Sequence, residues 1–257
     1  MMMNSDLVLG YDFDKWYGYG IKQPIVTDIS TKTNSHIILC GMSGSGKSFA
    51  ISELTSKLGI RALTNDTQNE TGKIYMADFK QDDHFSYLQG CPRYYPYAKS
   101  IEALEIVYDI LHKRQSGEDT SRSPVTLVWD EYIANILAIQ NTEKKKADEI
   151  MRKVSEILML GRSLSVQLVI SCQRPDASAF PSGSRLNYGI IIIVGAPIRS
   201  IYEMLIPKEY IDTIGERKFG VGEGVVLLQG SQLRFIKIPL VRDINKMKQI
   251  CIDALTK

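Results

Sequence analysis

Short apolar runs rich in β-branched residues recur along the chain, and between them lie longer stretches in which apolar residues follow the helical period. The apolar runs predict buried strands at 37–40, 74–78, 125–129, 166–171, 190–194, 225–229 and 233–238. The longer stretches predict helices at 48–59, 100–114, 143–160 and 243–256. Because nearly continuous apolar strands alternate with helices, the pattern predicts an α/β fold with a mainly parallel sheet and helices on both of its faces.

The two ends of the chain add detail to this picture. Gly230 and Ser231 lie between the last two predicted strands and favour a hairpin turn, so we expect an antiparallel edge hairpin near the C-terminus. Residues 1–35 are rich in aromatic residues and show no strong period. We interpret 1–35 as an extended lead-in that packs on a single domain formed by residues 36–257.

The composition is that of an ordinary globular protein, with 44% hydrophobic and 23% charged residues in a chain of 257. A formal net charge of +2 creates no strong overall positive field, so any contact with DNA has to come from local basic loops. The candidates are Lys144-Lys145-Lys146 and the Gly- and Ser-rich loop 176–187, although a Lys run on a helix is more often simply solvated.

Cysteine usage and hydropathy exclude several classes of protein. The four cysteines are scattered and form no C-x-x-C pair, which argues against a disulfide framework and against a zinc site. No signal peptide is recognisable, and no apolar run reaches the length of a membrane span. We therefore expect a cytoplasmic protein with reduced cysteines.

The segment Gly41-Met-Ser-Gly-Ser-Gly-Lys47-Ser48 is a complete phosphate-binding loop of the form G-x-x-x-x-G-K-[ST], placed between a predicted strand and a predicted helix. Its glycines allow backbone N–H groups to approach phosphates, Lys47 reaches the β- and γ-phosphates, and the Ser48 hydroxyl is a ligand for Mg²⁺. We expect ATP to be bound by Gly41, Met42, Ser43, Gly44, Ser45, Gly46, Lys47, Ser48 and Phe49.

Two acidic residues follow another predicted strand. Val125-Thr-Leu-Val-Trp129 is followed by Asp130 and Glu131, which is the Walker B form. Asp130 is the expected metal residue and Glu131 the residue that orients the attacking water, because the carboxyl ends of parallel strands converge on one site. A capped strand end is the alternative interpretation of this pair.

Gln173 directly follows the apolar run Leu168-Val-Ile-Ser-Cys172. An amide at this position can contact the γ-phosphate or the attacking water, as a catalytic residue beside Lys47 and Glu131. The spacing alone favours this role no more than a simple cap of the strand.

The ordered set of motifs resembles the FtsK/SpoIIIE branch of the FtsK–HerA superfamily. Beside the phosphate loop and Asp130-Glu131, the motifs that carry the resemblance are Asp78-Phe-Lys80, Gly161-Arg162-Ser163, Gln173-Arg174-Pro175 and Gly220-Val-Gly-Glu223. Phe79 departs from the family pattern, which typically has proline there. The resemblance extends from about residue 7 to residue 241, which is most of the chain.

The resemblance implies a RecA-like P-loop NTPase that hydrolyses ATP with Mg²⁺ and moves double-stranded DNA as a homo-oligomeric ring, typically a hexamer. It also implies an arginine finger that reaches a neighbouring subunit's nucleotide, with Arg162 as the first candidate and Arg185 as the second. For either arginine, the alternative is a surface ion pair.

The size and the motif set indicate a bare motor domain of the kind found in phages and mobile elements, and we expect neither a membrane anchor nor a DNA-reading winged helix. A viral genome-packaging or conjugative coupling ATPase is an alternative with the same chemistry. A nucleotide-switched, DNA-associated regulatory protein is an alternative of another class. The sequence leaves open which DNA is moved and which protein recruits the chain.

Overall fold

One mixed sheet forms the centre of the molecule. The structure, a computed structural model, describes residues 6–64, 71–180, 184 and 187–257. Its strands are β1 (Asp6–Asp12), β2 (Pro24–Asp28), β3 (Ile37–Gly41), β4 (Lys73–Asp78), β5 (Tyr94–Pro96), β6 (Val125–Asp130), β7 (Val166–Cys172), β8 (Ile190–Val194), β9 (Glu223–Leu228) and β10 (Gln232–Lys237). They form a 10-stranded sheet in the order β2-β1-β10-β9-β8-β3-β7-β6-β4-β5.

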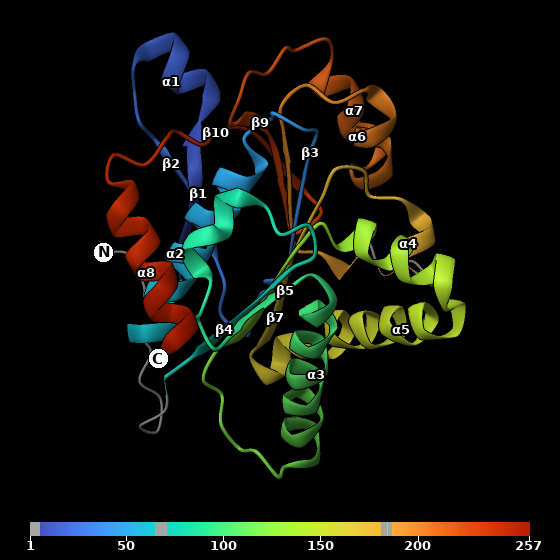
Figure 1. The fold of residues 1–257 in the computed structure, drawn as a ribbon. Helices are drawn as coiled ribbons and strands as arrows, with labels where there is room; N and C mark the ends of the chain where they lie inside the picture. The colour runs from blue at the N-terminus through green and yellow to red at the C-terminus, as the bar shows by residue number, and fades with distance from the viewer. Residues whose placement is uncertain (1–5, 65–70, 181–183, 185–186) are drawn as a thin grey trace.

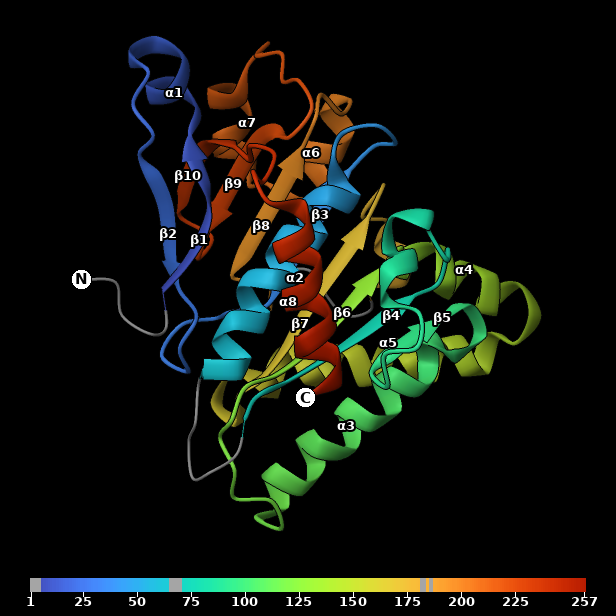
Figure 2. The same ribbon diagram turned by 60° about the vertical axis from the view of Figure 1, so that its left-hand side comes forward.

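The sheet has a parallel part and an antiparallel part. Strands β8, β3, β7, β6, β4 and β5 are parallel neighbours, and their carboxyl ends meet at one edge of the sheet. Strands β9, β10, β1 and β2 continue the sheet with antiparallel pairing. Figure 2 shows the parallel strands pointing toward the same end of the molecule.

Helices cover both faces of the sheet. The α-helices are α1 (Phe13–Tyr19), α2 (Lys47–Thr64), α3 (Ser100–Ser116), α4 (Tyr132–Thr142), α5 (Lys144–Leu160), α6 (Arg199–Leu205), α7 (Lys208–Ile214) and α8 (Ile244–Thr256). Short 3-10 helices are η1 (Asp83–Leu88), η2 (Tyr97–Lys99), η3 (Gly161–Leu164) and η4 (Ala177–Ala179). Helices α2 and α8 lie side by side on one face, whereas α3, α4 and α5 cover the other (Figure 1, Figure 2).

The alternation of side chains along β3 explains why two cores form. Ile37 and Leu39 point into the core beneath α2 and α8, and Ile38 and Cys40 point into the core beneath α3, α4 and α5. All four side chains are buried, so the strand is apolar at every position, as a doubly covered parallel strand requires. The expected α/β fold with a mainly parallel sheet and helices on both faces is confirmed.

The predicted elements are all present, and the structure adds others. The predicted strand 190–194 and β8 have the same bounds, and the remaining predicted strands and helices differ from the observed ones mainly at their ends. Residues 6–28 form β1, α1 and β2 in the region interpreted as an extended lead-in. The hairpin of β9 and β10 is present, but β1 and β2 lie outside it, so it is not the edge of the sheet. The division of the chain at residue 35 stays a prediction.

The described cysteines and helices agree with the hydropathy of the sequence. The cysteines are free thiols, with Cys40, Cys172 and Cys251 buried and Cys91 partly exposed. Within the described ranges, no helix combines the length and the apolar character that crossing a membrane requires.

Candidate nucleotide-binding site

The phosphate loop connects the end of β3 to the start of α2, at the carboxyl edge of the sheet. Gly44 and Gly46 have positive φ angles of 78° and 89°. A Cβ atom on Gly46 would also lie 3.1 Å from Val221 Cγ1 and 3.2 Å from the backbone nitrogen of Gly222. Position 46 therefore requires glycine for its backbone conformation and for the close approach of a second loop.

A polar cavity of about 350 Å³ opens at this loop, and we call it the phosphate-loop cavity. It is lined by Met42, Ser43, Gly44, Gly46, Lys47, Ser48, Phe49, Lys80, Asp82, Glu131, Gln173 and Val221. The structure thus brings most of the predicted nucleotide-binding residues together with Glu131 and Gln173, which lie far from them in the sequence. Gly41, Ser45 and Asp130 are buried and do not line the cavity.

Lys47 and the two Walker B carboxylates form a buried cluster. Lys47 Nζ lies 2.7 Å from Glu131 Oε1 and 3.6 Å from Asp130 Oδ1, and all three side chains are nearly inaccessible to solvent. Burial alone would lower the pKa of Lys47, but Asp130 and Glu131 together raise it above its ordinary value. The lysine therefore stays an ammonium ion that can donate to anionic oxygens in the cavity.

Glu131 is placed by an unusual backbone conformation. Its φ of 53° lies in the left-handed region, which is strained for a residue with a side chain. Its backbone N–H donates to Ser171 Oγ over 3.3 Å, and its Oε1 accepts a second hydrogen bond from Gln173 Nε2 over 3.0 Å. The end of β6 thus turns sharply so that the carboxylate faces the cavity, with Lys47 and Gln173 fixing its orientation.

Asp130 and Asp78 are register partners on the adjacent strands β6 and β4. Asp130 accepts a hydrogen bond from Ser171 Oγ, and Asp78 accepts one from Tyr94 OH over 2.7 Å. Burial raises the pKa of both carboxyl groups, with Lys47 opposing the shift at Asp130 and the Tyr94 bond opposing it at Asp78. Additional positive charge at this strand end would favour both carboxylates.

The donor atoms fit Mg²⁺. Ser48 and Asp130 offer hard oxygen ligands, which Mg²⁺ prefers, and the buried carboxyl groups gain from a nearby cation. No group of three or more His, Cys, Asp or Glu side chains in the described part of the chain could cage a metal ion. Mg²⁺ usually keeps waters and binds through one or two protein groups and phosphates, and Ser48 and Asp130 would be those protein groups here.

Comparison with known proteins bears on the family. No family model matches the chain. Its sequence is 30% identical over 109 residues to the FtsK domain-containing protein YdcQ of Bacillus subtilis (strain 168). The match covers 40% of this chain, which spans only 22% of the length of that protein. The resemblance to FtsK-type proteins is confirmed.

Solved structures support the fold over nearly the whole chain. The conjugation coupling protein TcpA of pCW3, with ATPγS, superposes with a TM-score of 0.72 at 18% identity, over 97% of this chain and 70% of that one. The cytoplasmic domain of the Type VII secretion ATPase EccC of Thermomonospora curvata superposes with a TM-score of 0.67 at 19% identity, over 98% of this chain and 31% of that one. The DNA-packaging ATPase B204 of Sulfolobus turreted icosahedral virus superposes with a TM-score of 0.52 at 14% identity, over 80% of this chain and 98% of that one. The RecA-like P-loop fold is thereby shown.

Two of the FtsK-like motifs bring residues to the cavity that were not predicted as site residues, Lys80 and Val221. Lys80 ends the Asp78-Phe-Lys80 motif and lines the cavity, with its Nζ 3.2 Å from Asp82 Oδ2. Val221 of the late glycine motif also lines the cavity, opposite Gly46. Both motifs were visible in the sequence, but their approach to the phosphate loop depends on the strand order.

The first candidate arginine finger, Arg162, does not line this chain's own phosphate-loop cavity. Arg162 lies in η3, directly before β7, and therefore at the amino edge of the parallel strands, opposite the phosphate loop. Gly161 beside it has no room for a Cβ, which would collide with the carbonyl oxygen of Val166. Arg185 lies outside the described residues. Lys144-Lys145-Lys146 is exposed at the start of α5, and part of loop 176–187 lies outside the described ranges.

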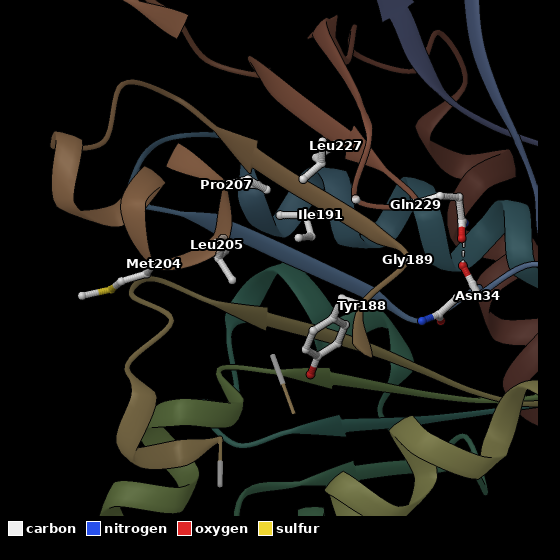
Figure 3. A pocket seen from close by; sticks show the side chains of 10 residues that line it. Asn34, Tyr188, Gly189, Ile191, Met204, Leu205, Pro207, Leu227 and Gln229 are labelled. Carbon is white, nitrogen blue, oxygen red and sulfur yellow. Dashed lines mark hydrogen bonds between the residues drawn. The ribbon is translucent and has the colours of Figure 1, made fainter. Parts of the chain in front are cut away.

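A second cavity, of about 380 Å³, lies at the amino end of β8 (Figure 3). Its lining is mainly apolar and includes Ile191, Leu205 and Leu227, and Gln229 Nε2 donates to the backbone oxygen of Asn34 over 2.9 Å at its rim. None of its lining residues is a lysine, an arginine or an acid. Its lining thus differs from that of the phosphate-loop cavity at the other end of the strands, which includes Lys47, Lys80 and Glu131.

Proposed function

We propose that this chain hydrolyses ATP with Mg²⁺ and uses the reaction to move double-stranded DNA as a homo-oligomeric ring. The observation that carries the proposal is the chain of contacts from Lys47 to Glu131 and from Glu131 to Gln173 at the rim of the phosphate-loop cavity. In one site it combines a cation for phosphates, a carboxylate for water and an amide that orients the carboxylate.

The residues support hydrolysis rather than transfer to a small acceptor. Bound Mg²⁺·ATP supplies the phosphoryl group and a metal that neutralises charge on its oxygens. Lys47 donates to the phosphate oxygens, which relieves Glu131 Oε1 of its strongest donor. Glu131 then accepts a proton from the attacking water, and Gln173 holds the carboxylate in place through Nε2.

DNA as the cargo rests on similarity and on the basic candidates. TcpA is named a conjugation coupling protein and B204 a DNA-packaging ATPase, and both share the fold. Because the net charge is only +2, DNA would be held by a few Lys and Arg side chains, of which the exposed Lys144-Lys145-Lys146 run is one candidate. Such contacts follow the backbone and do not select a sequence.

The position of Arg162 supports a ring. It lies at the edge of the sheet opposite this chain's own phosphate loop, so it can stabilise a transition state only on another subunit. A head-to-tail interface that closes into a ring, most simply a hexamer, repeats such a contact at every boundary.

ATP turnover with and without duplex DNA tests the proposal. We expect long duplexes of unrelated sequence to stimulate turnover. We also expect binding to weaken by about 0.9 log unit per log unit of salt for each phosphate neutralised. If DNA does not change the rate of ATP hydrolysis, the regulatory switch is favoured. A motor with another cargo is then also favoured, because the fold is similar to that of the secretion ATPase EccC. Particle mass with ATP and DNA tests the ring.

A further inference from the structure

The loop of residues 220–223, here called the 220–223 loop, supports the phosphate loop from the side opposite the Walker B strand. The backbone N–H of Gly222 donates to the carbonyl oxygen of Ser45 over 2.9 Å, inside the phosphate loop itself. Val221 is 65% exposed, lies beside Gly46 and lines the phosphate-loop cavity. A shift of this loop would therefore move the backbone that is expected to hold the phosphates.

Glu223 holds the 220–223 loop together. Its Oε2 accepts a hydrogen bond from the backbone N–H of Gly220 over 2.7 Å. Its Oε1 accepts one from Lys237 Nζ over 2.8 Å and another from Tyr17 OH. Burial opposes the charged form, but the bonds to Lys237, Tyr17 and Gly220 together lower the pKa of Glu223, so it stays a carboxylate.

Tyr17 brings helix α1 into this network. The helix has no buried residue of its own and lies at the carboxyl end of the sheet beside β10 (Figure 1, Figure 2). A second set of contacts fastens the helix to the segment that leads into the loop. Arg217 Nη1 lies 2.6 Å from Asp14 Oδ1, and the Phe13 and Phe219 rings meet edge to face at 5.6 Å.

We propose that helix α1 positions the phosphate loop through Tyr17 and the 220–223 loop, which makes Glu223 a positioning residue for the nucleotide. The inference rests on the nucleotide binding proposed above. Two glycines within residues 220–222 leave the loop little rigidity of its own, so its conformation depends on what Glu223 holds. When the competent conformation is populated less, the apparent affinity falls by the same factor.

Tyr17→Phe is the most selective test, because it removes only the hydroxyl group. We expect a fluorescent ATPγS analogue to bind about fivefold more weakly, as for a change of ~1 kcal/mol. The turnover number at saturating ATP should stay within about twofold of the wild type, because only binding is affected. Tyr19→Phe is the matched control, since Tyr19 lies on the same helix and is 78% exposed.

A second variant makes the test independent of the helix. Glu223→Gln keeps the size of the side chain but loses the charge that pairs with Lys237 and an acceptor oxygen for Gly220 or Tyr17. It should weaken nucleotide binding at least as much as Tyr17→Phe. The double variant should be no weaker than Glu223→Gln alone, because both changes act on one network.

The outcomes separate this inference from the proposed function. If the wild-type protein binds nucleotide no more tightly than Lys47→Ala does, the nucleotide site itself is contradicted. If the wild type binds more tightly than Lys47→Ala, but Tyr17→Phe binds like Tyr19→Phe, the site stands and the inference is wrong. A Tyr17→Phe protein that keeps full affinity and loses turnover also overturns it. Weaker binding with unchanged turnover and an unchanged melting temperature supports it.

Discussion

Replacing Glu131 with glutamine separates the chemistry from the architecture of the site. In the structure, Glu131 Oε1 accepts from both Lys47 Nζ and Gln173 Nε2, at 2.7 and 3.0 Å. A glutamine amide oxygen can accept the same two hydrogen bonds, so the geometry of the cavity should survive. What is lost is the charge that accepts a proton from the attacking water.

The expected magnitudes follow from these contacts. Loss of a general base typically lowers turnover by about 10²- to 10⁴-fold. The free energy of unfolding should fall by only ~1 kcal/mol, because the hydrogen bonds to Lys47 and Gln173 remain. In addition, Asp130 Oδ1 still lies 3.6 Å from Lys47 Nζ. ATP affinity should stay equal or rise, since Lys47 is held less strongly by the glutamine than by the carboxylate.

Steady-state ATP turnover, binding of a fluorescent ATPγS analogue and a melting curve measure these three quantities on one preparation. An E131Q protein that turns ATP over at the parent rate would show that Glu131 does not serve the attacking water. A variant that loses affinity as well as turnover would show instead that the carboxylate shapes the cavity, and that the retained hydrogen bonds do not suffice.

Two further substitutions test the phosphate contact and the ring. Lys47→Ala should weaken ATP binding by about 10- to 100-fold, because that is the value of a hydrogen bond to a charged group. Lys80 is a largely exposed lysine on the same cavity, so Lys80→Ala serves as the control and should have a smaller effect in the same titration. Arg162→Ala should keep ATP binding and lose about three orders of magnitude in turnover, as for other arginine fingers. Mixing it with Lys47→Ala subunits should partly restore turnover in an ATPase assay, and Arg162 does not act between subunits if no mixing ratio exceeds the sum of the two variants.

The sequence predicts most of the parallel strands because their signals are local. Strand β8 is an unbroken run of isoleucines ending in valine, and α2 begins at Lys47 inside a recognisable motif. Strand β1 escapes prediction because it buries only Leu7, Leu9 and Gly10, and because one of its two partners, β10, lies more than 200 residues away. Helix α1 buries no residue at all, so it carries no apolar period for a sequence analysis to detect.

The candidate site likewise contains residues that the sequence predicts and residues that it does not. Lys47, Asp130 and Glu131 lie in motifs whose residue types specify the chemistry, and the structure places them within hydrogen-bonding or ion-pair distance. Val221 and Lys80 reach the cavity from loops whose neighbours are fixed by the strand order, and no local pattern contains that order. A role for Arg162 depends on a second subunit, which no pattern within one chain describes.

The strand order gives the phosphate loop different neighbours on its two sides. On one side of β3, strands β7 and β6 are followed by Gln173 and Glu131, which line the phosphate-loop cavity. On the other side lie the end of β8 and the start of β9. Gly195 follows β8, and its N–H donates to the Glu223 carbonyl oxygen. The 220–223 loop leads into β9, and its Gly222 N–H donates to the Ser45 carbonyl oxygen. Substitutions on the first side should therefore lower turnover without weakening ATP affinity, and those on the second should lower affinity at constant turnover. The two effects should add in the free energies of the combined variants, because the residues share no direct contact.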